Sequence, residues 1–249
     1  MVVMVFRPLA VSLDEVGSAV WRASELGGAV GATVGTGHPA LDAQLPGGGW
    51  PVGAICEILQ VQSGQHEWRL LLPALTRVAS GPVVLVGAPR VPFGPGLVRQ
   101  GLDARRLLWV NIDASPARLW ATEQALRCAE VGAVLAWLPQ VRVEQLRRLQ
   151  IAASAHHKLL FVMRPAQAQG DSSPAVLRML VASCPAGEAP SDALQVQLLK
   201  RRGPPLAQAL TLPACQARLS ALLALSSHGR LAHANREGTD ALGRLATAA

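Results

Sequence analysis

The segment from Thr36 to Leu59 constrains the fold of this chain most strongly, and it reads T-G-H-P-A-L-D-A-Q-L-P-G-G-G-W-P-V-G-A-I-C-E-I-L. Leu41 and Leu45 are one helical turn apart, which predicts a short helix packed at the edge of a core. The glycines at 47–49 allow a tight backbone turn, and a strand is expected to begin at Gly53. The segment therefore predicts the first helix, turn and strand of a folded domain.

Apolar runs of strand length recur along the rest of the chain. Their hydrophobicity is continuous, as in V-V-L-V, which is typical of strands buried on both faces of a sheet. Helices are predicted between the runs, one starting at Ser115-Pro116 and one over 143–155. This alternation predicts an α/β fold with a mostly parallel central sheet flanked by helices. The predicted strands are Ala54 to Leu59, Val83 to Val86, Leu107 to Val110, Ala133 to Leu138, Leu159 to Met163 and Leu194 to Leu199.

The 249 residues, half of them apolar, suffice for one substantial core and a small appendage. We predict an N-terminal helical segment over 1–32, with a helix from Val11 to Leu26 that carries Trp21. A core over 33–213 follows, and then a tail over 214–249 that could bind a partner and order on binding. No apolar run reaches the roughly 18 residues of a membrane helix, and residues 1–6 do not resemble a secretory signal. A cytoplasmic protein that does not engage a membrane is expected.

The cysteines and histidines do not form a metal-binding pattern. Four cysteines are spread along the chain without a C-x-x-C pair, at Cys56, Cys128, Cys184 and Cys215. They are interpreted as buried apolar residues. His156-His157 has no acidic or cysteine neighbour, so no metal site is predicted.

The net charge of +7 favours a partner with a phosphate backbone or an acidic protein, unless the cations are simply scattered over a solvated surface. The densest cluster is Lys200-Arg201-Arg202, which has no acidic residue within several positions. It predicts a DNA or acidic-partner contact. Arg164 opens the polar segment R-P-A-Q-A-Q-G-D-S-S-P, which is either a mobile loop that contacts a phosphate backbone through Arg164 or an idle connector.

The motif T-G-x-x-x-L-D-x-x-L-x-G-G-G-x-x-x-G-x-x-x-E-I, present from Thr36 to Ile58, resembles the entry of RecA-like recombinase domains. Within that superfamily the chain most resembles the ImuA family, RecA-like accessory proteins encoded in bacterial damage-response cassettes. W-R-A-S-E-L-G at 21–27, L-A-W-L-P at 135–139 and L-K-R-R-G at 199–203 carry the resemblance, which covers about residues 11–213. It implies a RecA-like core.

The resemblance also places a phosphate loop after Leu59, but the residues there do not suit one. Such a loop needs glycine N–H groups, a lysine and a hydroxyl residue. Trp137 stands where a magnesium-side aspartate is expected, and residues 87–90 lack the carboxylate that polarises water. We therefore predict no catalytic residue, no cofactor and no enzyme activity, and we expect a carboxylate at Glu67 to repel a triphosphate. The degenerate loop comprises Gln60, Gln62, Ser63, Gly64, Gln65, His66 and Glu67, with Val61 between the first two.

Six tryptophans and no tyrosine occur in the chain. Core packing is predicted for Trp109, Trp120 and Trp137 because they lie in apolar strands or on apolar helix faces. Trp50 and Trp68 flank the degenerate loop, and they are expected to fill the space that a nucleotide would occupy.

The function implied by the resemblance is that of a non-catalytic RecA-like adaptor in SOS-induced mutagenic translesion DNA synthesis. The implied partners are an ImuB-type Y-family-like protein and RecA or its filament, with single-stranded DNA and an error-prone replicative-type polymerase as further candidates. Such a protein would associate with the nucleoid when engaged. Two alternatives remain open: a SulA-like inhibitor of the division protein FtsZ, and an ATP-binding RecA-like ATPase with a rearranged site.

Overall fold

The computed structural model describes residues 31–213, except 79–80, 185–192, 204–205 and 207. The predicted N-terminal segment and tail therefore lie almost entirely outside the described residues. The strands are β1 (Thr33–Val34), β2 (Trp50–Pro51), β3 (Ala54–Gln60), β4 (Val83–Val86), β5 (Leu107–Val110), β6 (Ala133–Trp137), β7 (Leu159–Pro165), β8 (Leu177–Ser183), β9 (Leu194–Lys200) and β10 (Leu210–Leu212). The α-helices are α1 (Pro39–Asp42), α2 (Glu67–Leu75), α3 (Gly94–Arg99), α4 (Ser115–Arg127) and α5 (Val143–Ala155), and the short 3-10 helices are η1 (Ala104–Arg106) and η2 (Ala166–Gly170).

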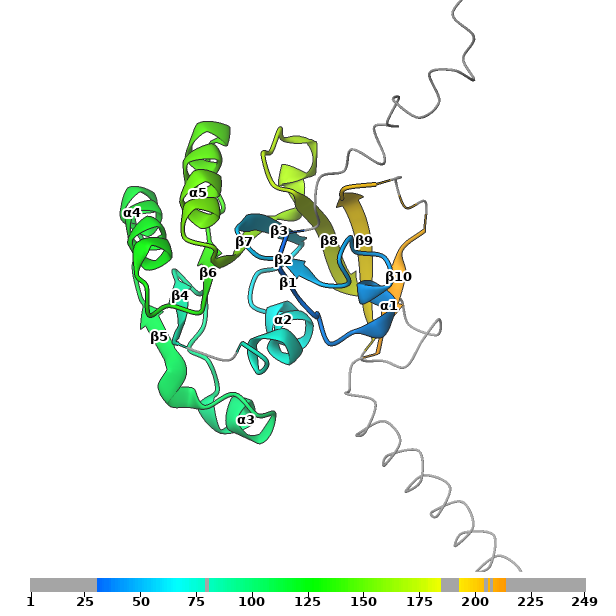
Figure 1. Ribbon diagram of the computed structural model, residues 1–249, viewed down its shortest axis with the longest axis horizontal. Coiled ribbons are helices and arrows are strands. Elements are labelled where there is room, and N and C mark those ends of the chain that lie inside the picture. Colours follow the sequence, from blue (N-terminus) through cyan, green and yellow to red (C-terminus); the bar gives the residue numbers. More distant parts are fainter. Residues whose placement is uncertain (1–30, 79–80, 185–192, 204–205, 207, 214–249) are drawn as a thin grey trace, which may run out of the picture.

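Eight strands form the central sheet in the order β10-β9-β8-β3-β7-β6-β4-β5, while β1 and β2 pair separately (Figure 1). The six strands from β8 to β5 in that order are parallel, and β9 and β10 add two antiparallel strands at one edge. The predicted α/β fold with a mostly parallel sheet is confirmed, and the arrangement is consistent with a RecA-like core. All six predicted strands are present, with ends that differ by at most two residues.

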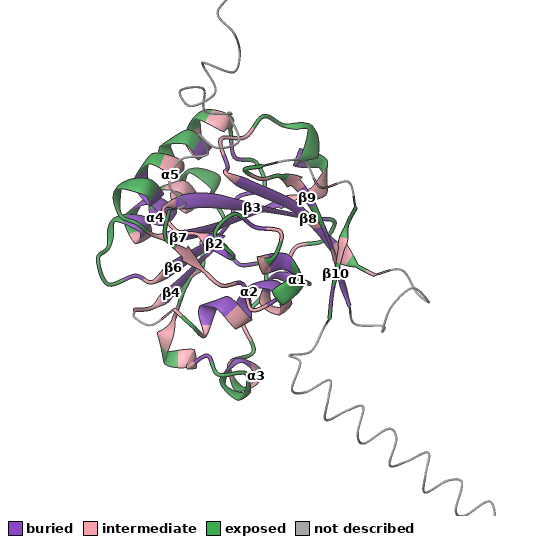
Figure 2. Cartoon of the chain, turned by 45° about the vertical axis from the view of Figure 1, so that its right-hand side comes forward, coloured by how far each residue is buried: buried purple, intermediate pink, exposed green. Residues whose placement is uncertain are grey.

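Helices cover both faces of the sheet and bury its side chains (Figure 2). On one face, α1 and α2 pack over Cys56, Ile58 and Phe161. On the other face, α4 and α5 pack over Ile55 and Val162. Because both faces are covered, the central strands have continuous apolar sequences, as the runs in the sequence predicted.

The Thr36 to Leu59 segment folds as predicted into a short helix, a glycine turn and a buried strand. Leu41 of α1 and the nearby Leu45 are buried, and Asp42 Oδ1 accepts a hydrogen bond from Thr36 N at 2.8 Å. Gly49 passes so close to the backbone of Val34 that a Cβ atom there would collide with the Val34 carbonyl. Only glycine fits this approach, so this turn explains part of the motif.

A buried carboxylate lies on the α4/α5 face of the sheet, where the chain crosses from β7 to β8. Glu57 of β3 is 0% exposed, and its carboxylate accepts hydrogen bonds from Arg164 Nη1 at 2.8 Å and Arg178 Nε at 2.9 Å. Arg164 also pairs with Asp171 at 2.7 Å. Two buried guanidinium groups are tolerable here because carboxylates neutralise them.

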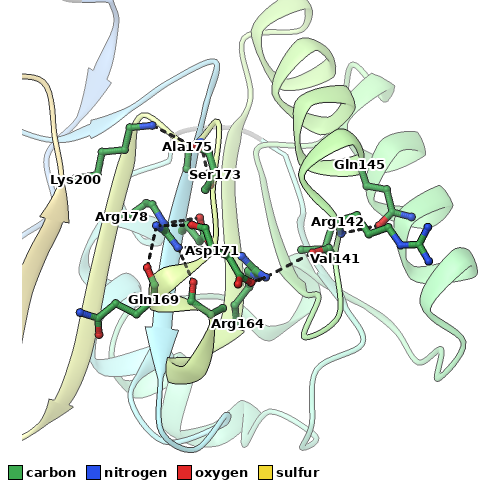
Figure 3. Close-up of polar contacts among 12 residues, drawn as sticks. Val141, Arg142, Gln145, Arg164, Gln169, Asp171, Ser173, Ala175, Arg178 and Lys200 are labelled. Atoms are coloured by element: carbon green, nitrogen blue, oxygen red, sulfur yellow. Dashed lines mark hydrogen bonds and ion pairs between the residues drawn. The ribbon is translucent and has the colours of Figure 1, made fainter.

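The same arginines hold the crossover that contains η2 over β3 (Figure 3). Arg178 Nη2 donates to Ala168 O at 2.9 Å and its Nη1 donates to Asp171 O at 3.1 Å. Of the two alternatives for this segment, the one in which Arg164 contacts a phosphate backbone is thereby corrected. Its guanidinium is buried and paired inside the sheet, so it is not presented to a phosphate backbone.

Strand β8 was not predicted, because Arg178 interrupts its apolar run. Two of the three tryptophans that were predicted to be buried are also exposed: Trp109 by 40% and Trp120 by 63%, whereas Trp137 is buried. Trp109 lies in β5, the edge strand of the sheet, and strand neighbours cover only one side of an edge strand. Cys56 is buried as expected, but Cys128 is exposed.

Among the helices that the structure describes, none is long and apolar enough to cross a membrane.

Replacing Glu57 with Gln is expected to lower the free energy of unfolding by about 3–5 kcal/mol, because the change leaves two buried arginines under-compensated. Urea denaturation of the two proteins measures this loss. Glu144→Gln removes an exposed carboxylate from α5 and should change stability by less than about 0.5 kcal/mol. Equal losses in the two variants would show that the buried network is not required.

Candidate functional site

The degenerate loop connects β3 to α2, at the carboxyl end of the parallel strands. The loop closes on the side chain of Glu67, the first residue of α2. Glu67 Oε1 accepts from Gly64 N at 2.7 Å, and Glu67 Oε2 accepts from His66 N at 3.1 Å. Backbone N–H groups in such a loop and at a helix N-terminus are the donors that hold phosphates in nucleotide-binding proteins. In this chain a side-chain carboxylate takes these two donors.

Trp137, the last residue of β6, supplies the third donor to this carboxylate. Its indole Nε1 donates to Glu67 Oε1 at 2.9 Å, across 70 positions of sequence. Trp137 is 4% exposed and Glu67 is 1% exposed, so the contact is closed to solvent. Two backbone N–H groups and one indole N–H thus donate hydrogen bonds to the buried carboxylate of Glu67. The tryptophan at the position expected for a metal-binding aspartate therefore donates a hydrogen bond to the carboxylate of this loop.

Residues after β4 close the loop from the other side. Gly64 has a φ of +88°, and a Cβ atom there would lie 3.2 Å from Pro89 Cγ. The segment after β4, where a water-activating carboxylate was expected, therefore packs against the loop backbone. Nearby, Arg118 of α4 donates to Ile112 O at 2.6 Å and to Trp137 O at 3.2 Å. Arg118 thereby links the segment after β5 to the end of β6, the two strands on either side of β4.

His66 lies next to the carboxylate but is a poor candidate for a cation. Burial lowers the pKa of its imidazole, and the nearby Arg69 lowers it further, while Glu67 acts in the opposite direction. The neutral ring is therefore favoured near neutral pH. Its Nδ1 and both amide atoms of the buried Gln60 have no hydrogen-bond partner among the described residues. The loop therefore offers an external phosphate neither a lysine nor a charged histidine.

Trp50 and Trp68 do not take the role that the sequence suggested for them. Trp50 is fully buried and packs edge-on against Phe161, with ring centroids 5.2 Å apart. Trp68 is partly buried and packs against apolar side chains of the core. Trp137 is buried in the core as predicted, and its indole also contacts the loop. Its role was not recognised because a polar contact of a tryptophan cannot be inferred from a surrounding apolar run.

The basic cluster lies at the other end of the sheet, where β9 ends. Lys200 is exposed and its Nζ donates to Ser173 O at 3.0 Å (Figure 3). Arg201 is partly buried and bonds to the backbone carbonyl of Gln44, and Arg202 is exposed. Lys200 and Arg164 thus contact the same crossover between β7 and β8, but Lys200 is exposed whereas Arg164 is buried. A contact of the cluster with DNA or an acidic partner remains a prediction.

A metal site has no obvious ligands in the part of the chain that the structure describes. Within those residues, His, Cys, Asp and Glu side chains do not gather in groups of three that could hold an ion.

Replacing Glu67 with Gln should lower the free energy of unfolding by about 1.5–3 kcal/mol, because the amide NH₂ cannot accept the hydrogen bonds that one carboxylate oxygen accepts. Glu144→Gln is the matched control, since Glu144 is also a glutamate in the first turn of a helix, but it is exposed. Chemical denaturation of both variants measures the difference. Losses of similar size would mean that Glu67 acts only on the helix dipole.

Comparison with known proteins identifies relatives over as much as 63% of the chain. No protein-family model matches the chain. Over 172 residues the chain is 29% identical to Protein ImuA of Caulobacter vibrioides strain NA1000 / CB15N. This match covers 63% of this chain and 70% of that protein. Protein ImuA of the ATCC 19089 strain of the same species matches equally. Cell division inhibitor SulA of Photorhabdus laumondii is 33% identical over 82 residues, covering 33% of this chain and 46% of SulA.

The two ImuA matches cover about twice as much of the chain as the SulA match. They agree with the motif at Thr36 to Ile58 and with the mostly parallel α/β sheet that the structure contains. The chain is therefore similar to ImuA proteins over 63% of its length.

Proposed function

We propose that this protein, which is similar to ImuA, acts in DNA damage-induced mutagenesis, as a non-catalytic adaptor in translesion synthesis. Its RecA-like domain would contact an ImuB-type Y-family-like protein and RecA or its filament. Because its shape resembles a RecA subunit, it would compete for the surface through which RecA protomers contact one another, or cap that surface. The similarity to ImuA supports the role in mutagenesis.

The observation that carries the non-catalytic part of the proposal is the Glu67 carboxylate. It takes two backbone N–H groups of the loop, and Trp137 adds a third donor in a closed, buried contact. A phosphate could reach these donors only by displacing the carboxylate, and the two anions would repel each other at this distance. The loop also lacks the lysine that neutralises a triphosphate. These features favour an adaptor over an ATPase with a rearranged site.

Two measurements test the proposal. Calorimetric titration with millimolar MgATP or ADP should show no binding, because the donors are already used. In the host organism, deletion of the gene should abolish damage-induced mutation, and the wild-type chain should restore it. Nucleotide binding that is lost in variants of residues 60–67 would overturn the non-catalytic reading. Normal induced mutation in the deletion strain would overturn the role in mutagenesis.

The match to SulA favours one second candidate, an inhibitor of FtsZ. This relative is 33% identical to the chain over the 82 matched residues. Overexpression would then arrest cell division and produce filaments, whereas the adaptor leaves division unchanged. A pull-down from damaged cells, followed by mass spectrometry, distinguishes a polymerase partner, RecA and FtsZ in one experiment.

Contact with single-stranded DNA through the basic cluster is a further part of the proposal. Replacing Lys200, Arg201 and Arg202 with Ala should weaken DNA binding and reduce the slope of log K against log salt by about 2, at roughly 0.7 per lost phosphate contact. Fluorescence anisotropy at several salt concentrations measures both quantities. The control replaces three exposed arginines elsewhere, Arg90, Arg99 and Arg147, with Ala. An unchanged affinity in the cluster variant assigns the cluster to a protein contact.

A further inference from the structure

A cavity of about 660 Å³ lies at the amino end of β3, far from the degenerate loop. The turn at 45–54, the end of α5, the start of β8 and the end of β9 form its walls. Its volume is in the range of sites that bind ligands or buried side chains. The degenerate loop and the Glu57 network do not contribute residues to its wall, so the features described above do not explain this cavity.

The wall of the cavity combines positive charge with aliphatic surface. Arg201, Arg202 and His157 line it, and its described lining contains no aspartate or glutamate. Leu45, Val52 and several other aliphatic or proline side chains form the rest, again with no aromatic residue among the described lining. Without an aromatic platform the cavity is poorly suited to stack a nucleobase. It suits an apolar side chain that is flanked by carboxylates.

The chain itself carries an apolar side chain flanked by carboxylates, in the sequence just before the first residue that lines the cavity. Residues 11–26 contain three carboxylates and one arginine, a net negative segment in a protein of net charge +7. Asp14, Trp21 and Glu25 are spaced by seven and four residues. In the helix that the sequence predicts for this segment, this spacing places all three side chains on one face. That face presents a large apolar side chain between two carboxylates.

The connection between this segment and the cavity is short. Gly31 is the first described residue and lines the cavity. Four residues lie between Leu26 and Gly31, and even a fully extended chain spans only about 18 Å over the five steps from one to the other. The end of the acidic segment is therefore tethered beside the cationic wall. At this separation the effective concentration of a tethered segment is high.

We propose that residues 11–26 dock on this cavity of their own chain, with Trp21 in the aliphatic part and with Asp14 and Glu25 facing Arg201 and Arg202. Arg201 is already oriented, since it bonds to the Gln44 carbonyl, while Arg202 is exposed at the rim. The docked segment covers part of the basic cluster. An anionic partner of the cluster therefore has to compete with it.

Hydrogen exchange on the full-length protein, followed by mass spectrometry, tests the docking. Amides of residues 13–26 should exchange at least about tenfold more slowly than the same amides in a synthetic peptide of residues 11–28, because docking protects them. Two variants should remove the protection. Ser154→Trp fills the cavity from its α5 wall, and Arg202→Glu reverses the charge at the rim. Arg99→Glu, the same charge change on the exposed end of α3, should leave it intact.

Charge exchange gives a sharper version of the test. Combining Arg202→Glu with Glu25→Arg should restore the protection that either single change removes, which a general loss of stability would not do. The proposal would be overturned if amides 13–26 of the wild-type protein exchanged as fast as those of the free peptide. It would also be overturned if their protection persisted in both cavity variants. Protection that disappears on dilution together with a dimer in light scattering would also overturn it, because the occupied cavity would then belong to a second copy.

Discussion

A carboxylate without exposed surface, that of Glu57, lies among the parallel strands and binds two arginines that are themselves buried. These arginines come from β7 and β8, the two strands that flank β3, and they also hold the crossover between those strands. Isolated charges could not remain in this environment, because the desolvation cost of each is several kcal/mol. The order of the central strands and the position of η2 are thus tied to one ion cluster.

At the carboxyl end of the same strand, another carboxylate accepts the hydrogen bonds of the loop between β3 and α2. Glu67 takes the backbone donors of its own loop, Trp137 supplies a further donor, and Pro89 packs against the loop backbone. A buried polar loop must satisfy its N–H groups in some way. Here the Glu67 side chain does so for Gly64 and His66, while both amide atoms of Gln60 have no partner among the described residues.

Much of the fold could be predicted from the sequence. The strands were recognisable because continuous apolar runs mark strands that are covered on both faces, and the glycine turn before β3 was recognisable from its motif. Strand β8 was missed because Arg178 is buried only through a carboxylate 121 positions away. Trp109 is exposed because β5 lies at the edge of the sheet. A local sequence pattern does not predict the order of strands in a sheet.

The candidate site was predicted less completely. The absence of a lysine from residues 60–67 could be read directly from the sequence. The use of Glu67 could not, because it depends on a side chain folding back onto its own loop and on Trp137, 70 residues further along. The carboxylate was expected to repel a ligand, and the contacts show that it also holds the loop together.

The hydrogen bonds between Glu67 and its own loop have a thermodynamic consequence. A protein that binds a ligand only when folded gains stability in proportion to RT ln(1 + [L]/Kd), so its folded fraction follows the concentration of the ligand. The carboxylate of Glu67 is part of the chain and is present at the same stoichiometry under all conditions. The hydrogen bonds that Glu67 accepts from this loop therefore do not depend on the concentration of a ligand.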